Sequence, residues 1–122
     1  MINEDRLVRT FCDLVQIDSP SGEEEAVAQD IESRLKVLGF TIKRDSHGNL
    51  LASEEGTNPF LLSAHMDTVE PGRGIKPRIV GDQIESDGTT ILGGDCKAGV
   101  AAILEALESI KEDQLNRMPV QL

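Results

Sequence analysis

The sequence predicts a layered α/β domain. Two segments with apolar residues at helical spacing precede a series of segments with strand patterns, and a third helical segment follows. Helices that alternate with strands in this way are typical of layered α/β domains. The 122 residues suffice for one domain of ordinary size. The hydrophobic fraction of 39% and the charged fraction of 28% indicate a globular chain.

The first two predicted elements are helices. Residues 2–17 have apolar side chains at helical spacing, and Pro20 ends this helix because proline disfavours helical backbone in the residue before it. Ser21 is the expected N-cap of the second helix, and Glu24, three residues later, would complete a capping box. This second helix is expected to extend to about Leu38.

Strand patterns follow the second helix. Residues 40–43 and 49–53 predict two strands joined by a polar turn over 45–48. The continuous apolar run 59–64 predicts a strand that is buried on both faces. A short hairpin is expected over residues 78–85.

The last predicted helix follows a pair of glycines. Residues 97–111 have apolar side chains at helical spacing, after Gly93 and Gly94. Residues 118–122 begin a further extended, apolar segment, and the chain ends within it. We expect the unpaired strand edges and the apolar surface left there to cause self-association or poor solubility, or to bind a partner chain.

Composition excludes several classes of protein. The net charge of −10 argues against a nucleic-acid or anionic-membrane partner, since both need a basic face. Without Trp or Tyr, the chain has almost nothing to stack on bases or sugars. No apolar run is long enough to span a bilayer, and the first residues do not form a signal peptide. Cys12 and Cys96 are too far apart for a CxxC motif. We therefore expect a cytoplasmic protein.

His65 and Asp67 directly follow the predicted buried strand. Ligands bind at the carboxyl ends of strands in open α/β sheets, and neutral imidazole is a good zinc ligand that a nearby carboxylate can orient. The simpler interpretation is a histidine that caps the strand end, with Asp67 as a loop acid. The pair alone favours that simpler interpretation. His47, the other histidine, lies in a predicted turn and is interpreted as a turn residue.

Asp95 opens the third predicted helix in the sequence Gly93-Gly94-Asp95-Cys96-Lys97. Glycine lets the backbone approach a ligand closely. Asp95 could equally be an N-cap, because aspartate is among the best residues for that position. The pattern of a phosphate-binding loop is absent. We expect Cys96 not to act as a nucleophile and Lys97 to be solvated or ion-paired.

Residues 63–72 and 86–99 together resemble the two metal motifs of a known family. This family comprises the zinc-dependent exopeptidases related to peptidase T, carboxypeptidase G and aminoacylase. The loop 71–77 is most similar to that of peptidase T and its tripeptidase-like relatives, and residues 17–23 also fit. The resemblance implies a layered α/β/α catalytic domain with a mixed sheet, incomplete in this chain.

The resemblance also implies roles for three residues. His65 would be a terminal ligand of one Zn²⁺, Asp67 the catalytic carboxylate that orients His65, and Asp95 the bridge between two metal ions. Co²⁺ or Mn²⁺ could replace zinc. The family often has a cis bond after the bridging aspartate, here Asp95–Cys96. Relatives commonly have Asp, Asn or Met where this chain has Cys96.

A complete site needs more than this sequence offers. Two zinc ions need about five or six protein ligands, and the sequence offers two strong candidates. In relatives, a glutamate pair that supplies the general base and a ligand follows a strand similar to residues 118–122. Further ligands and a lid domain used in dimerisation also belong to the relatives. We therefore expect residues 1–122 to be the N-terminal portion of a dinuclear zinc peptidase catalytic domain, without the lid domain and inactive alone.

The expected function is metal-dependent hydrolysis of short peptides by removal of the N-terminal residue, as in a tripeptide aminopeptidase. One alternative is an aminoacylase, deacetylase or carboxypeptidase of the same family. Another is an inactive α/β fragment that acts as a binding module. The expected partners are a short peptide substrate and, for the full-length enzyme, a second identical subunit, with no nucleic acid or membrane.

Overall fold

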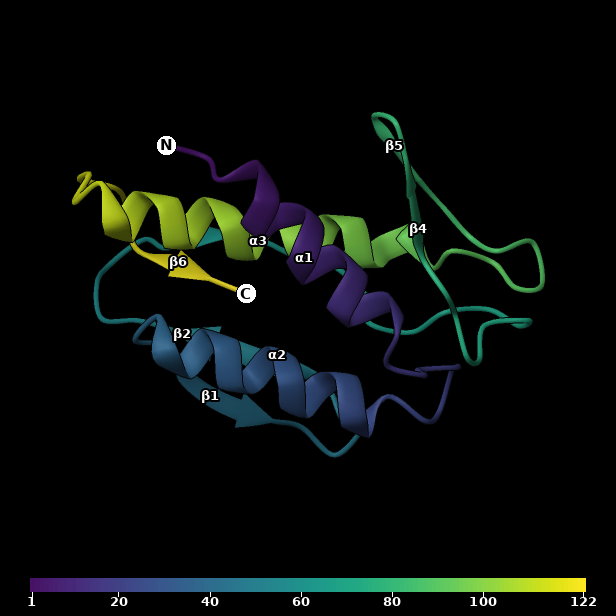
Figure 1. Cartoon of the computed structure of the whole chain (residues 1–122). Coiled ribbons are helices and arrows are strands. Elements are labelled where there is room, and N and C mark those ends of the chain that lie inside the picture. Colours follow the sequence, from purple (N-terminus) through teal and green to yellow (C-terminus); the bar gives the residue numbers. More distant parts are fainter.

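Three helices and six strands make up the chain in the computed structural model, which describes all 122 residues (Figure 1). The elements, in chain order, are α1 (Glu4–Val15), α2 (Glu25–Val37), β1 (Thr41–Arg44), β2 (Leu50–Ser53), β3 (Phe60–Leu61), β4 (Arg78–Val80), β5 (Gln83–Glu85), α3 (Gly94–Glu112) and β6 (Val120–Gln121). None of the helices combines the length and the apolar character that crossing a bilayer requires.

The main sheet is mixed. Its strand order is β1-β2-β6-β3, so the last strand of the chain lies inside the sheet. β6 pairs with β2 antiparallel and with β3 parallel. Ala52 and Leu122 exchange backbone hydrogen bonds of 2.8 and 2.9 Å at this junction. The predicted fold class, α/β with a mixed sheet, is confirmed.

The helices pack in two groups. α1 lies against α3, and α2 lies against β1 and β2 (Figure 1). The antiparallel pair β4–β5 forms the predicted hairpin and projects beside one end of α3 (Figure 1). Buried apolar side chains of both groups form one core: Phe11, Leu14, Val15, Val27, Ile31, Leu35, Phe40, Ala52, Ile75, Val100, Ala101, Leu104, Leu107 and Val120.

The start of the second helix differs from the prediction. α2 begins at Glu25 with Glu24 at the N-cap, and no side chain caps it. The Glu24 carboxylate instead accepts a hydrogen bond from the Gly22 backbone N–H, at 2.8 Å. The prediction that Ser21 caps this helix was therefore wrong, because its hydroxyl donates to Asp67 instead.

The apolar run 59–64 also differs from its prediction. Only Phe60 and Leu61 form strand β3, and both are exposed, at 57% and 64%. β3 packs mainly against β6, and no helix packs extensively on it, so its side chains stay uncovered. Burial on both faces was therefore predicted wrongly for this segment.

Candidate metal centre

His65 lies on the segment that continues from β3 past the end of the sheet. The backbone N–H of Leu62 still pairs with Gln121 of β6, at 2.8 Å, and the pairing stops before His65. The His65 side chain is half exposed, at 50%. The imidazole therefore lies just beyond the end of the strand, where a ligand can reach it.

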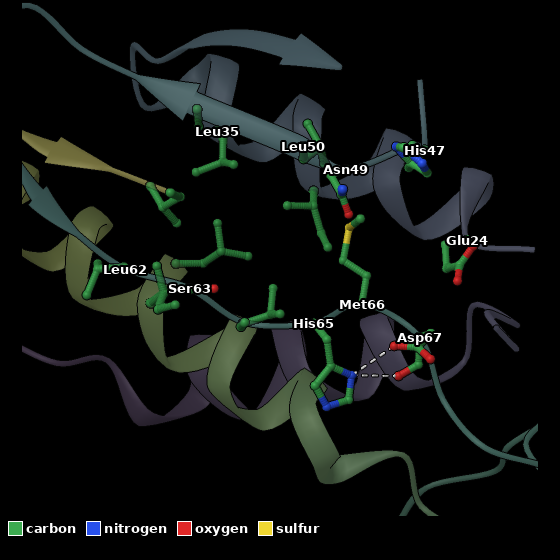
Figure 2. Close-up of a pocket in the computed structure, with 18 residues that line it drawn as sticks. Glu24, Leu35, His47, Asn49, Leu50, Leu62, Ser63, His65, Met66 and Asp67 are labelled. Atoms are coloured by element: carbon green, nitrogen blue, oxygen red, sulfur yellow. Dashed lines mark hydrogen bonds and ion pairs between the residues drawn. The ribbon is translucent and has the colours of Figure 1, made fainter. Parts of the chain in front are cut away.

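Asp67 contacts one ring nitrogen of His65. His65 Nδ1 lies 3.0 Å from Asp67 Oδ1 and 3.1 Å from the Asp67 backbone oxygen (Figure 2). The second carboxylate oxygen of Asp67 accepts a hydrogen bond from the Ser21 hydroxyl. The Ser21 hydroxyl and then the His65 ring lower the pKa of Asp67. A charged carboxylate beside Nδ1 favours the imidazole tautomer that carries the ring proton on Nδ1.

Asp95 lies on an irregular turn at the start of α3. Gly93 has a φ of 81°, and a side chain there would approach the methyl group of Thr68 to 3.3 Å. Asp95 has non-helical backbone angles, and the Asp95–Cys96 peptide bond is cis, as the resemblance implied. The Asp95 side chain is 97% exposed, and its Oδ1 lies 3.1 Å from His65 Nε2. The turn thus presents Asp95 to His65 and not to the helix backbone.

The facing atoms of His65 and Asp95 suit a cation. When Nδ1 carries the proton, Nε2 is an acceptor, and it faces a carboxylate oxygen that is also an acceptor. A metal ion bound by both atoms, or a second proton on the ring, would remove this mismatch. Asp95 is accordingly the main cause of the raised pKa of His65. The Cys96 thiol belongs to the same cluster, in which all donor atoms lie within 4.8 Å of one another. An imidazole, a carboxylate and a thiol are donors that zinc accepts.

The environment of Lys97 differs from its prediction. Its side chain is fully buried and is not solvated or ion-paired as expected. Its Nζ donates a hydrogen bond of 2.8 Å to the backbone oxygen of Ile17. Burial lowers the pKa of Lys97 to about 8. The lysine therefore joins the turn that carries Asp95 to the segment that follows α1.

A cavity of about 320 Å³ opens beside His65 (Figure 2). His65, Met66 and Asp67 line one end of it, and its walls are mostly apolar side chains from α2, β2 and α3. His47 lies in a turn, as predicted, and also lines this cavity. The candidate centre therefore adjoins a space with apolar walls and a few polar groups, which is usual for small-molecule sites.

The three residues that the motifs singled out thus lie together. His65 contacts both Asp67 and Asp95. Reasoning from the sequence missed Ser21, whose position ahead of a helix suggested a cap. It also gave no ligand role to Cys96, which the structure places in the cluster of donors.

Known proteins are similar to this chain in sequence and in structure. A tripeptidase from Staphylococcus aureus matches 99% of the chain at 45% identity and a TM-score of 0.89. Aminopeptidase PepT from Bacillus cereus matches 98% at 37% identity and a TM-score of 0.93. The uncharacterised protein YqjE of Bacillus subtilis is 37% identical over 99% of the chain. No protein-family model matches.

The matched region is only part of each relative. The chain spans 36% of the tripeptidase, 35% of PepT and 36% of YqjE. Similarity to peptidases over nearly the whole chain confirms the resemblance that the two motifs indicated.

Proposed function

Because this chain is a relative of peptidase T and tripeptidase, we propose that it forms part of the catalytic centre of a metal-dependent peptidase. The whole protein would remove the N-terminal residue from short peptides, with a tripeptide as the preferred substrate class. The observation that carries the proposal is the approach of His65 Nε2 to Asp95 Oδ1, which lie 3.1 Å apart.

In this proposal His65 and Asp95 contribute to a site for two zinc ions that share the Asp95 carboxylate. His65 would be a terminal ligand of one ion, and Asp95 would bridge both with its two oxygens. When bound, zinc would act as a Lewis acid toward the peptide carbonyl and would lower the pKa of water. Asp67 would keep the proton of His65 on Nδ1, so that Nε2 stays free to bind.

The described residues supply too few ligands for two ions. About five or six protein ligands are needed, and the cluster contains His65 and Asp95, with the thiol of Cys96 beside them. We propose that the remaining ligands and the general base belong to the rest of a longer protein. We therefore expect a polypeptide of these 122 residues alone not to hydrolyse peptides.

The tripeptidase interpretation is favoured over an aminoacylase or a carboxypeptidase of the same family. The loop 71–77 resembles that of peptidase T, and the S. aureus tripeptidase is 45% identical to this chain. A full-length protein that contains these residues would distinguish the alternatives in assays with tripeptides and with N-acyl amino acids. Faster cleavage of N-acyl amino acids would contradict the tripeptidase assignment.

Binding of Zn²⁺ tests the centre itself. A full-length protein that contains these residues is freed of metal and titrated with Zn²⁺ in competition with a chromophoric chelator. We expect His65→Ala and Asp95→Ala each to weaken binding strongly. His47→Ala removes the other histidine, which lies in an exposed turn, and should leave the affinity unchanged. Equal affinity of the His65→Ala variant and the unaltered protein would overturn the proposed centre.

A further inference from the structure

The segment between α1 and α2, residues 17–21, contacts both loops of the candidate centre. The Ser19 hydroxyl donates to the backbone oxygen of Met66 at 3.0 Å, and the Thr68 N–H donates to the Ser19 oxygen at 2.9 Å. Ser19 is fully buried. These two bonds fix the backbone on either side of Asp67.

The same segment is tied to the start of α3 and to the loop that contains Gly74. Lys97 donates to the Ile17 oxygen at 2.8 Å, and the Gly74 N–H donates to the Asp18 carboxylate at 2.8 Å. The main chain of the segment therefore has fixed partners on several sides. A side chain carried by it can act as a rigid donor toward the centre.

Ser21 is that side chain. Its hydroxyl donates to Asp67 Oδ2, while Asp67 Oδ1 lies against His65 Nδ1. The Ser21 hydroxyl does not cap α2. Its hydrogen bond is to the Asp67 carboxylate. Ser21 is exposed, so its replacement leaves the core intact.

We propose that Ser21 is a positioning residue for the metal centre, acting through Asp67 on His65. This inference rests on the proposed function. A carboxylate without a donor on Oδ2 can rotate about its side-chain bonds. His65 Nδ1 then has a competing acceptor, the backbone oxygen of Asp67, at 3.1 Å. With Ser21 in place, the carboxylate plane is fixed, and the ring orientation that aims Nε2 at Asp95 is fixed with it.

The first measurement is the Zn²⁺ affinity of a full-length protein that contains these residues, with and without the substitution Ser21→Ala. Partners of a metal-binding histidine typically change metal affinity by about 10- to 100-fold. Because Ser21 contacts His65 only through Asp67, we expect Ser21→Ala to weaken Zn²⁺ binding by the smaller of these factors, about tenfold. Ser21→Thr keeps the hydroxyl and should retain most of the affinity. The control is Ser33→Ala, which removes an exposed serine of α2 whose hydroxyl donates to the Gln29 backbone oxygen and which should not change the affinity.

The second measurement is the nitrogen spectrum of His65 in the metal-free protein. Long-range ¹H–¹⁵N correlations report which ring nitrogen carries the proton. We expect the Nδ1–H form in the unaltered protein and a mixture of tautomers in Ser21→Ala. Thermal unfolding of both proteins should coincide. Should Ser21→Ala lower the unfolding temperature, Ser21→Gly, which also removes the hydroxyl and adds no metal-binding group, replaces it.

The outcomes separate this inference from the proposed function. If the full-length protein that contains these residues binds no Zn²⁺, the proposed metal centre fails, and the tautomer measurement still decides whether Ser21 orients His65. If the full-length protein binds Zn²⁺ and its Ser21→Ala variant binds it equally well with the same tautomer, the role of Ser21 is overturned and the metal centre stands.

Discussion

Gly99 is the residue whose lack of a side chain makes room for the Cys96 thiol. A Cβ on Gly99 would lie 2.7 Å from Cys96 Sγ, well inside van der Waals contact. Alanine in a helix interior is normally more stable than glycine by about 0.5–1 kcal/mol. Here that gain is opposed by overpacking, which typically costs about 1–3 kcal/mol.

We therefore predict that Gly99→Ala lowers the free energy of unfolding by about 1 kcal/mol. In a Cys96→Ala background the same substitution should raise it by about 0.5–1 kcal/mol, because no sulfur occupies the space. Urea unfolding of the four proteins, without metal, measures this coupling. Equal effects of Gly99→Ala in both backgrounds would show that the thiol does not need this space.

Residue types and spacing predicted part of the site. His65, Asp67 and Asp95 were found because a short motif follows a strand and another precedes a helix. Ser21 and Lys97 were misinterpreted for the same physical reason. Their partners, Asp67 and the Ile17 oxygen, are 46 and 80 positions away in the chain. Local patterns indicate caps and exposed faces, but they do not reveal such distant hydrogen bonds.

At the scale of elements, Glu105 joins α1 to α3. The residue is 3% exposed, and its carboxylate accepts hydrogen bonds from Arg6 Nε at 2.7 Å, from Arg6 Nη2 at 2.9 Å and from the Asn3 N–H at 2.7 Å. Arg6, as the largest cause, lowers the pKa of Glu105 to about 2. The start of α1 is therefore held on α3 by a buried negative charge.

This pKa shift predicts a pH dependence of stability. The unfolded chain binds a proton at Glu105 near pH 4.5, and the folded chain binds it only near pH 2. The unfolded state thus holds more protons in this window, so the stabilisation is complete above pH 4.5 and is lost as the pH falls toward 2. Urea unfolding between pH 2 and 7 measures it.

The variant Glu105→Gln isolates this contribution. At neutral pH we expect it to be less stable by about 3 kcal/mol, because it leaves Arg6 without its main partner. The difference from the unaltered chain should shrink as the pH approaches 2. Glu108→Gln, a more exposed neighbour 3.4 Å from Arg6, should have little effect. A pH-independent difference for Glu105→Gln would exclude the ionised carboxylate as the cause.

The predicted elements differ in how well the sequence located them. The β4–β5 hairpin and the turn over residues 45–48 agree with the prediction, because glycine and aspartate specify turns locally. The run 59–64 was predicted as a buried strand, and β3 is exposed. An apolar run indicates that a strand prefers burial, but the elements that pack on the faces of the sheet decide whether it is covered.

At the scale of the whole molecule, the two edges of the main sheet differ in chemistry. β1, at one edge, carries Lys43 and Arg44. β3, at the other edge, carries Phe60 and Leu61, which are exposed at 57% and 64%. Charged side chains protect an edge strand from pairing with another chain, whereas exposed apolar side chains favour that pairing. β3 is therefore the unprotected edge.

We predict that a polypeptide of these 122 residues self-associates through β3. Sedimentation velocity over a range of concentrations should show species larger than the 13.2 kDa monomer. Leu61→Lys places a charge on the β3 edge and should shift the distribution toward monomer, because pairing there would bury an ammonium group. Thr41→Lys adds the same charge to β1, which already carries basic residues, and should leave association unchanged. If the two variants behave alike, association does not occur through β3, and a purely monomeric unaltered chain would show that the exposed residues of β3 do not drive pairing at all.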